Sequence, residues 1–331
     1  MDVFDELLRG VRGKGAVFGR SVLYPPWSLR FPGDAYLTLC VPLRGEGWIV
    51  PEGGSGDGGG SGDHAAHRVP VGETAIVRGP APFLFTDAPA TGTGTGRGVG
   101  PGTSVREVRW DTGPGADPVP PGELSGPTVL LAAAYDVRSE VPRRLLQVLP
   151  PVLVVPDEED SSPLRDYLEG QIGKARPGGQ IVLDRLLDWL LVCTLRDWFD
   201  RPEAAPPAWY RALGDEVAGP ALHALHEEPA HAWTTAELAA RAGVSRTTFA
   251  KRFTELVGQG PVAYLTEWRM TLATDLLSRQ DLTVAAVARR VGYADAFGFS
   301  TAFKRVRGTS PSAYRRGSAE REELGRKAPT G

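Results

Sequence analysis

Residues 292–316, GYADAFGFSTAFKRVRGTSPSAYRR, constrain the fold more than any other stretch of this chain. A glycine opens the stretch, Phe299 and Phe303 stand four residues apart, and Lys304 and Arg305 begin a basic run. Residues four apart share one face of a helix, so the pattern predicts a helix with an aromatic inner face and a cationic end. Such a helix suits insertion into the major groove of DNA.

A related pattern of helix, glycine turn and helix precedes it in LAARAGVSRTTFAKRF, residues 238–253. The matched pairs are Leu238 and Val287, Arg241 and Arg290, Ala242 and Val291, and Gly243 and Gly292 at an offset of 49, and Phe249 and Phe299, and Phe253 and Phe303 at an offset of 50. The second turn is therefore one residue longer, at a position where loops tolerate insertion. The duplication predicts two helix-turn-helix units in one chain.

Residues 261–279, between the two copies, predict one long helix. Apolar side chains recur there every three or four residues, as they do along one helix face: Val262, Leu265, Trp268, Leu272 and Leu276. Pro261 suits the first helical turn, because a missing N–H costs nothing there. Such a helix would hold the two units at a fixed separation.

The 292–316 stretch resembles the C-terminal signature of the AraC/XylS family of bacterial transcription factors. The residues that carry the resemblance are Gly292, Tyr293, Phe299, Phe303, Lys304, Arg305, Gly308, Pro311, Tyr314 and Arg315. The alternative is an unrelated amphipathic helix with a basic end, which would not match in register at so many positions. The resemblance implies two recognition helices that enter successive major grooves of double-stranded DNA, about 34 Å apart on one face.

The resemblance also assigns the residues that face DNA. They are Arg246, Thr247, Ala250 and Lys251 in the first recognition helix, and Ala296, Phe297, Ser300 and Thr301 in the second. Arginine and lysine read guanine, serine and threonine are versatile, and alanine or phenylalanine contacts a thymine methyl. Because the second set lacks long polar side chains, we expect the first helix to dominate base readout and the second to contribute shape and phosphate contacts.

Three cations are the expected phosphate contacts: Arg252, Lys304 and Arg305. For each of them the alternative is a solvated surface charge. The distribution of charge supports a polyanionic partner for the C-terminal part alone. Residues 233–316 carry 13 Lys and Arg against 6 Asp and Glu, a net charge of +7, whereas residues 1–232 carry 21 against 31, a net charge of −10.

Short apolar or alternating runs, broken by glycine and proline, fill residues 16–86 and predict a β-sandwich or barrel. Residues 41–54 and 69–85 resemble the two β-halves of a cupin, a small jelly roll that precedes the DNA-binding module in many AraC-type regulators. The fold class is therefore α+β and multidomain. Glycine-rich stretches at 53–63 and 91–122 predict mobile loops, and residues 127–137 predict a returning strand.

Helical patterns flank this β region. Residues 1–14, 163–174, 181–200 and 217–228 predict helices, and residues 141–155 predict a short helix followed by an extended segment. Helix 181–200 is apolar over much of its circumference, so either its own domain or a second subunit must cover it. The expected organisation is a cupin-like domain at 1–156, a helical segment at 157–200, a linker at 201–216, the DNA-binding domain at 217–316 and a charged, frayed tail at 317–331. The family resemblance implies that the segment 157–200 mediates dimerisation, and packing within its own domain is the alternative.

Six side chains of the β region would line a cavity for an apolar or aromatic effector: Trp27, Leu29, Tyr36, Leu39, Trp48 and Phe83. The alternative is that they simply fill the barrel. Metal-dependent cupins carry histidine ligands where this chain has Cys40, Pro42, Leu43, Phe83 and Phe85, and its nearby histidines, His64 and His67, border a glycine loop. We therefore expect no metal, no cofactor and no catalytic residue. His223, His226 and His231 are interpreted as surface residues.

The combined prediction is a cytoplasmic, sequence-specific transcription regulator that forms a homodimer and, if it activates, contacts RNA polymerase. Two cysteines, no secretory signal and no membrane-spanning run agree with this location. Two alternatives remain open. One is a cupin-type metal enzyme fused to a DNA-binding module, and the other is a regulator without a ligand, controlled by protein contacts.

Overall fold

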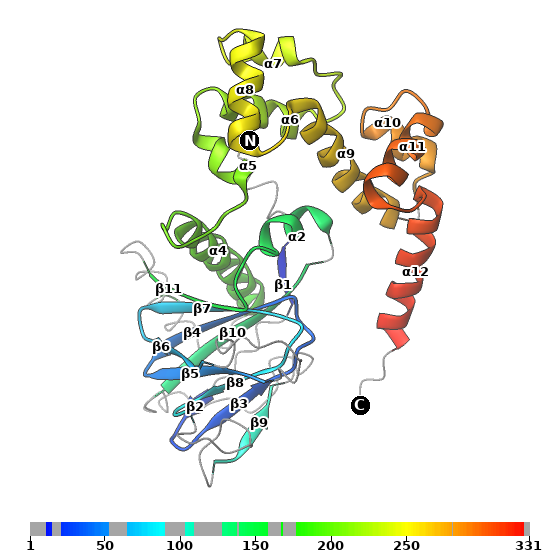
Figure 1. The fold of residues 1–331 in the computed structure, drawn as a ribbon. Helices are drawn as coiled ribbons and strands as arrows, with labels where there is room; N and C mark the ends of the chain where they lie inside the picture. The colour runs from blue at the N-terminus through cyan, green and yellow to red at the C-terminus, as the bar shows by residue number, and fades with distance from the viewer. Residues whose placement is uncertain are drawn as a thin grey trace. The chain divides into compact units, whose positions relative to one another are not determined.

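A computed structural model describes residues 11–14, 21–52, 65–89, 103–108, 128–137, 139–157, 167, 177–279 and 281–327. The described residues form two compact units (Figure 1). The β unit lies within 11–137 and 149–205, and the helical unit lies within 138–148 and 206–331. Each unit has its own hydrophobic core.

Two sheets make up the β unit. The first contains β1 (Arg12–Lys14), β10 (Thr128–Asp136), β4 (Leu37–Arg44), β7 (Glu73–Arg78) and β11 (Val152–Pro156) in this order, with β2 (Ser21–Leu23) also paired to β10. The second contains β6 (His67–Pro70), β5 (Glu46–Pro51), β8 (Phe83–Thr86), β3 (Ser28–Phe31) and β9 (Val105–Glu107). The ladders are antiparallel except for β3 with β9. The predicted cupin-like β domain is therefore confirmed.

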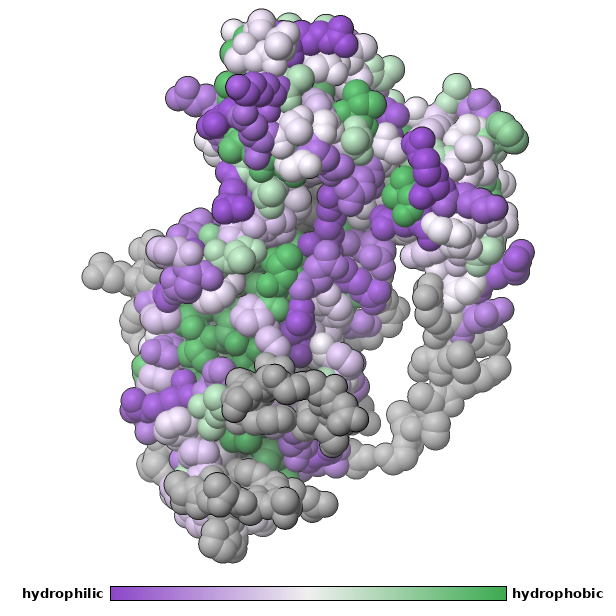
Figure 2. Space-filling model, viewed as in Figure 1, coloured by the Kyte–Doolittle hydropathy of each residue, from purple (hydrophilic) through white to green (hydrophobic). Residues whose placement is uncertain are grey.

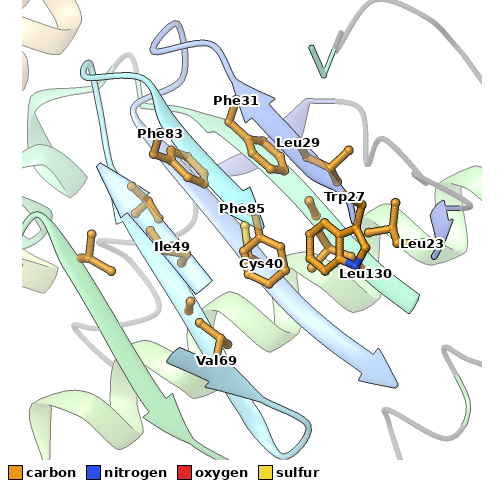
Figure 3. Close-up of a cluster of buried hydrophobic side chains, with 14 residues drawn as sticks. Leu23, Trp27, Leu29, Phe31, Cys40, Ile49, Val69, Phe83, Phe85 and Leu130 are labelled. Carbon is orange, nitrogen blue, oxygen red and sulfur yellow. The ribbon is translucent and has the colours of Figure 1, made fainter. Parts of the chain in front are cut away.

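Side chains from both sheets meet in one buried cluster (Figure 3). Phe31 stacks on Phe83 with ring centroids 4.7 Å apart, and Trp27 stacks on Phe85 at 5.6 Å. A Cβ atom at Gly47 would lie 2.4 Å from the Phe85 ring, so only glycine lets this ring lie against β5. Burying each such side chain contributes about 1.5–3 kcal/mol, so this cluster stabilises the packing of the two sheets.

Helix α4 (Gly179–Phe199) packs within the β unit, against β1 and β11. The Tyr135 hydroxyl of β10 donates to the Leu187 carbonyl at 2.8 Å, and the Gly13 amide donates to the Asp188 carboxylate at 2.9 Å. Leu183 and Leu191 are buried on the same side of the helix. Packing within the domain thus covers the inner face of α4. Three large apolar side chains stay exposed on the outer face: Ile181, Val182 and Trp189.

The helical unit contains α5 (Ala208–Arg211), η2 (Ala212–Gly214), α6 (Ala218–Glu227), α7 (Thr235–Arg241), α8 (Arg246–Val257), α9 (Pro261–Ser278), α10 (Val284–Arg290), α11 (Ala296–Arg307) and α12 (Pro311–Lys327). A further helix, α2 (Glu140–Leu146), also belongs to it, although its residues lie in the sequence between β10 and β11. The most deeply buried aromatic side chains of the unit include Phe249, Phe253, Trp268, Phe299 and Phe303. The inward orientation predicted for the four phenylalanines is therefore confirmed.

Several boundaries differ from those expected. Residues 12–14 form strand β1 paired with β10 rather than the end of a helix, and residues 1–10 lie outside the described part. The linker expected at 201–216 is shorter, because Trp209 and Ala212 are buried in the helical unit. Val262 of α9 is 55% exposed and therefore lies outside the buried stripe that contains Leu265 and Trp268. The tail is helical as far as Lys327 instead of frayed.

Other expectations fall partly outside the described residues. The loop 53–63 and most of the helix expected at 163–174 lie there, with Tyr167 the one described residue of that helix. The loop expected at 91–122 contains β9, which pairs in parallel with β3. No described helix is both long and apolar enough to cross a membrane.

Candidate nucleic-acid interface

Two helix-turn-helix units recur in the helical unit with equal element lengths. Helices α7 and α10 have 7 residues each, and α8 and α11 have 12 residues each. Gly243 and Gly292 carry positive φ angles of 67° and 81° in the two turns. At Gly292 a Cβ atom would also lie 2.5 Å from the Ala230 carbonyl oxygen, so glycine is required there for two reasons. The predicted duplication is confirmed in structure.

Local sequence explains where these helices begin and end. Ser245 caps α8 by accepting from the Thr248 amide at 3.1 Å, and Asp295 caps α11 by accepting from the amides of Phe297 and Gly298 at 2.8 Å. Thr234 and Glu237 form a capping box at the start of α7. Glycines in the left-handed conformation end both recognition helices, at positions 258 and 308.

The outer face of α8 is polar and cationic. Arg246, Thr247 and Lys251 are exposed, and Ala250 is half-buried between them and the core. Lys251 forms an ion pair of 3.9 Å with Glu255, and exposed pairs of this kind contribute little. Figure 2 shows hydrophilic side chains on the visible face of the α7–α8 unit. This face can therefore present hydrogen-bond donors to a groove with little rearrangement.

The outer face of α11 differs along its length. Phe297, Thr301, Lys304 and Arg305 are exposed at spacings that place them on one helix face, and Phe297 is 84% exposed. Ala296 and Ser300 are half-buried beside them, and the Ser300 hydroxyl donates to the Ala296 carbonyl at 2.7 Å. The first turn of α11 is thus apolar at its surface and the last turn is basic.

Arg252 already forms an ion pair within the protein, so it is not free to bind a phosphate. Its guanidinium donates to the Asp215 carboxylate at 2.7 Å and 3.1 Å, and the same carboxylate accepts from the Val217 and Ala218 amides at the start of α6. Partial burial acts to raise the pKa of Asp215, but these donors outweigh it and lower the pKa. A phosphate contact by Arg252 would therefore have to compete with Asp215.

His226 is buried, and its interpretation as a surface residue is wrong. Its ring stacks on Trp268 with centroids 4.4 Å apart, and its Nε2 atom lies 2.6 Å from the Tyr264 hydroxyl oxygen. Burial, with the nearby Arg144 and His223 charges, lowers the pKa of His226 to about 3. The spacing of Ala218, Leu222 and His226 on α6 could have placed this histidine on the buried face.

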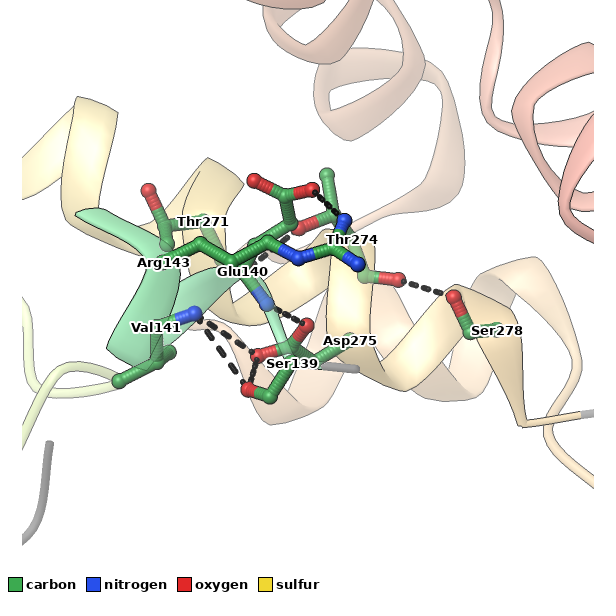
Figure 4. A network of polar contacts seen from close by, with 8 residues as sticks. All are labelled: Ser139, Glu140, Val141, Arg143, Thr271, Thr274, Asp275 and Ser278. Atoms are coloured by element: carbon green, nitrogen blue, oxygen red, sulfur yellow. Dashed lines mark hydrogen bonds and ion pairs between the residues drawn. The ribbon is translucent and has the colours of Figure 1, made fainter. Parts of the chain in front are cut away.

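Helix α2 binds the connector α9 through Asp275 (Figure 4). The Ser139 hydroxyl donates to one carboxylate oxygen of Asp275, and the Glu140 amide donates to the other at 2.7 Å. Arg144 adds an ion pair of 3.5 Å with Glu267 and lies over the Tyr264 ring. Burial raises the pKa of Asp275 despite these donors. Nothing in the local sequence pattern predicts this contact.

The proposed effector-lining residues do not all face the same space. Trp27, Leu29 and Phe83 lie in the buried cluster between the sheets (Figure 3). Leu39 and Trp48 neighbour Cys40 and Ile49, which point into that cluster, so alternation along a strand turns Leu39 and Trp48 to the opposite face. Tyr36 precedes β4 and is half-buried. Leu39 and Trp48 therefore face away from the interior between the sheets.

One buried polar group of this interior, on Trp27, has no hydrogen-bond partner among the described residues. This group is the indole N–H, a hydrogen-bond donor. In the same described part, which leaves out His64, no group of three His, Cys, Asp or Glu side chains is placed to hold a metal ion.

Comparisons with known families cover both units. A family described as "Cupin" matches residues 2–200, and a family described as "Helix-turn-helix domain" matches residues 238–317. An AraC-like transcription regulator of Streptomyces antibioticus is 36% identical over 191 residues, which cover 56% of this chain and 63% of that protein. AlkR of Acinetobacter baylyi, named as an HTH-type transcriptional regulator, is 35% identical over 145 residues, covering 44% of this chain and 47% of that protein.

A solved structure of the AdpA DNA-binding domain in complex with target DNA is 34% identical, covering 36% of this chain and all of that one, with a TM-score of 0.31. The chain thus spans less than two thirds of the length of each of the two regulators that it matches by sequence. The cupin match alone extends over more than half of the chain, and the helix-turn-helix match covers most of the helical unit. The chain belongs to the AraC-type regulators that carry an N-terminal cupin domain, as its sequence signature predicted.

Proposed function

We propose that this protein binds specific sequences of double-stranded DNA and regulates transcription. The observation that carries the proposal is the pair of helix-turn-helix units, in which α8 and α11 each expose one face while Phe249, Phe253, Phe299 and Phe303 are fully buried on the other. The basic charge of residues 233–316 supplies the attraction to phosphate that both units need. Similarity to proteins named as transcription regulators supports the same conclusion.

Each residue on the outer faces of α8 and α11 has a proposed role. Arg246, Thr247, Ala250 and Lys251 read bases from α8, while Ala296, Phe297, Ser300 and Thr301 face the groove from α11. Lys304 and Arg305, exposed in the last turns of α11, contact phosphates. Arg252 reaches a phosphate only when its ion pair with Asp215 opens, so we rank it below Lys304 and Arg305.

The β unit supplies regulation in this proposal. A small apolar effector would compete with the stacked Trp27 and Phe85 rings for the interior, and the unpaired Trp27 N–H would give it a donor. The filled cluster between the sheets equally favours the second candidate, a regulator controlled by protein contacts without a ligand. The exposed Ile181, Val182 and Trp189 of α4 are the surface we assign to a homodimer. Contact with RNA polymerase and location in the cytoplasm belong to the same proposal.

The proposal is tested by selecting duplexes from a random library with the purified full-length protein. We expect an enriched motif with two elements about one helical turn apart, because the two recognition helices enter successive grooves. The Arg246→Ala variant should lose selection in one element and keep it in the other. Failure of a correctly folded protein to enrich any motif would refute the function.

A further inference from the structure

Phe297 is more exposed than any other large hydrophobic side chain in the described part of the chain, at 84%. The helix itself forces this exposure. Phe299 and Phe303 are fully buried on the inner face of α11, and Phe297 lies on the other side. A single exposed apolar residue is common on protein surfaces, so its exposure alone carries little weight. Its neighbours give it meaning.

Phe297 begins the same helix face that ends in two cations. Positions 297, 301, 304 and 305 follow helical spacing, and all four side chains are exposed. In the duplicated unit, Thr247 occupies the position equivalent to Phe297 and begins the polar face of α8. The basic end of α11 draws this face toward a phosphate backbone, which places Phe297 near the bases rather than in bulk solvent.

Other groups in the first turn of α11 are poorly suited to reading guanine. The Asp295 carboxylate already accepts from the Phe297 and Gly298 amides, so these amides are not free to donate to DNA. The Ser300 hydroxyl gives its proton to the Ala296 carbonyl. Guanine presents only acceptors in the major groove, and the charge of Asp295 repels acceptors and phosphates alike. An apolar contact is the interaction that this turn can offer.

We propose that the second helix-turn-helix unit reads thymine, through contact of the Phe297 ring with C5-methyl groups in the major groove. This inference rests on the proposed function and refines it. The lack of long polar side chains predicts mainly shape and phosphate contacts for α11, whereas the exposure of Phe297 gives this helix direct readout of one base. The two units then differ in chemistry: α8 reads by hydrogen bonds and α11 reads by burial of methyl groups.

The test replaces thymine by deoxyuracil, which removes the methyl group and leaves base pairing intact. Duplexes carrying the selected motif are prepared with deoxyuracil at each thymine in the element that the Arg246→Ala variant still selects. For the wild-type protein, loss of a contacted methyl should weaken binding about fourfold, the factor expected for one buried CH₂-sized group. The Phe297→Ala variant should bind the thymine and deoxyuracil duplexes equally.

A matched variant separates this effect from a general loss of affinity. Thr247→Ala changes the equivalent position of α8, so it should keep the wild-type ratio of thymine to deoxyuracil binding in the α11 element. Thermal unfolding checks that both variants stay folded, as expected for exposed positions. Wild-type binding that is insensitive to deoxyuracil throughout the α11 element would overturn the inference while leaving sequence-specific binding intact. The inference would also be overturned if Phe297→Ala lowered the affinity for both duplexes by the same factor and so kept the wild-type preference for thymine over deoxyuracil.

Discussion

Asp275→Ala should release α2 from the connector helix α9. The Asp275 carboxylate accepts from the Ser139 hydroxyl and the Glu140 amide, and more weakly from the Val141 amide at 3.4 Å. Alanine provides no acceptor, so the Ser139 hydroxyl and the Glu140 amide at the start of α2 lose their protein partner. The Arg144–Glu267 ion pair and the buried side chains of α2 remain, so the helix loosens without a change of fold.

The magnitude follows from the contacts. Loss of a helix N-cap costs about 0.5–2 kcal/mol, and leaving a buried donor unpaired costs about 1–3 kcal/mol. Val141 keeps a weak alternative acceptor in the Ser139 hydroxyl at 3.4 Å, which limits the sum. We therefore expect the docking of α2 to weaken by about 2 kcal/mol, which corresponds to a roughly 30-fold larger open population. Asp275→Asn keeps one acceptor oxygen and should cost less.

Hydrogen exchange followed by mass spectrometry measures this opening in the full-length protein. The peptide covering residues 139–147 should exchange about 30-fold faster in Asp275→Ala than in the wild type. Asp281→Ala is the matched control, because Asp281 is exposed and its ion-pair distance to Arg279 is 3.7 Å. If Asp275→Ala and Asp281→Ala exchange alike across this peptide, the assignment of Asp275 as the anchor of α2 is wrong.

The pH dependence of the same variants has a definite sign. Burial raises the pKa of Asp275, so the folded protein holds this proton more tightly than the unfolded chain. Stability of the wild type should therefore fall, relative to Asp275→Asn, as the pH rises from about 4 through the raised pKa. Urea unfolding of both proteins at several pH values measures their free energies of unfolding. A wild type that gains stability relative to Asp275→Asn as the pH rises would contradict the raised pKa.

Three further predictions concern the helical unit. The pKa of His226 is lowered to about 3 in the folded protein, so at pH 4.5 this histidine is neutral when folded and protonated when unfolded. We therefore expect the free energy of unfolding of the wild type, measured in urea, to fall by about 2–3 kcal/mol between pH 7.5 and 4.5 relative to His226→Gln. Gly292→Ala should destabilise by about 2 kcal/mol or more, because a positive φ and the Ala230 carbonyl both oppose a Cβ, whereas Gly258→Ala has a positive φ in open space and should cost about 1 kcal/mol; equal shifts in melting temperature would refute the steric part. Lys304→Ala should lower the slope of log affinity against log salt by about 1 on every duplex, while Lys251→Ala should cost about 1–3 kcal/mol on the selected motif alone, and the reverse pattern would exchange their roles.

Much of the helical unit could be predicted because its signals are local. Phe249 and Phe253, and again Phe299 and Phe303, repeat with helical spacing, and glycine marks both turns. The strands of the β unit are predictable on the same basis, from short alternating runs between turns. In these segments, the residues that determine the element lie within it, so periodicity is sufficient.

Faces and distant contacts are harder to predict. Leu39 and Trp48 group with Trp27 in the sequence because all three side chains are large and apolar. Side chains alternate along a strand, however, so Leu39 and Trp48 face away from the interior into which their neighbours Cys40 and Ile49 point. The Ser139–Asp275 contact joins residues 136 positions apart, and a polar pair at that separation leaves no periodic pattern. The charge of Arg252 alone suggests a phosphate contact, and its pairing with Asp215 depends on how α6 begins.

The position of α2 in the chain affects any attempt to exchange modules between such regulators. A recombinant gene joined at the proline-rich segment 201–207 would carry α9 with its Asp275 and Glu267 carboxylates but would lose α2, which is encoded more than 50 residues earlier. The transplanted helices would then face the α2 of a foreign cupin, with side chains not selected to fit. Compatible parents for a chimera are therefore better chosen by the sequence of residues 139–148 than by overall identity.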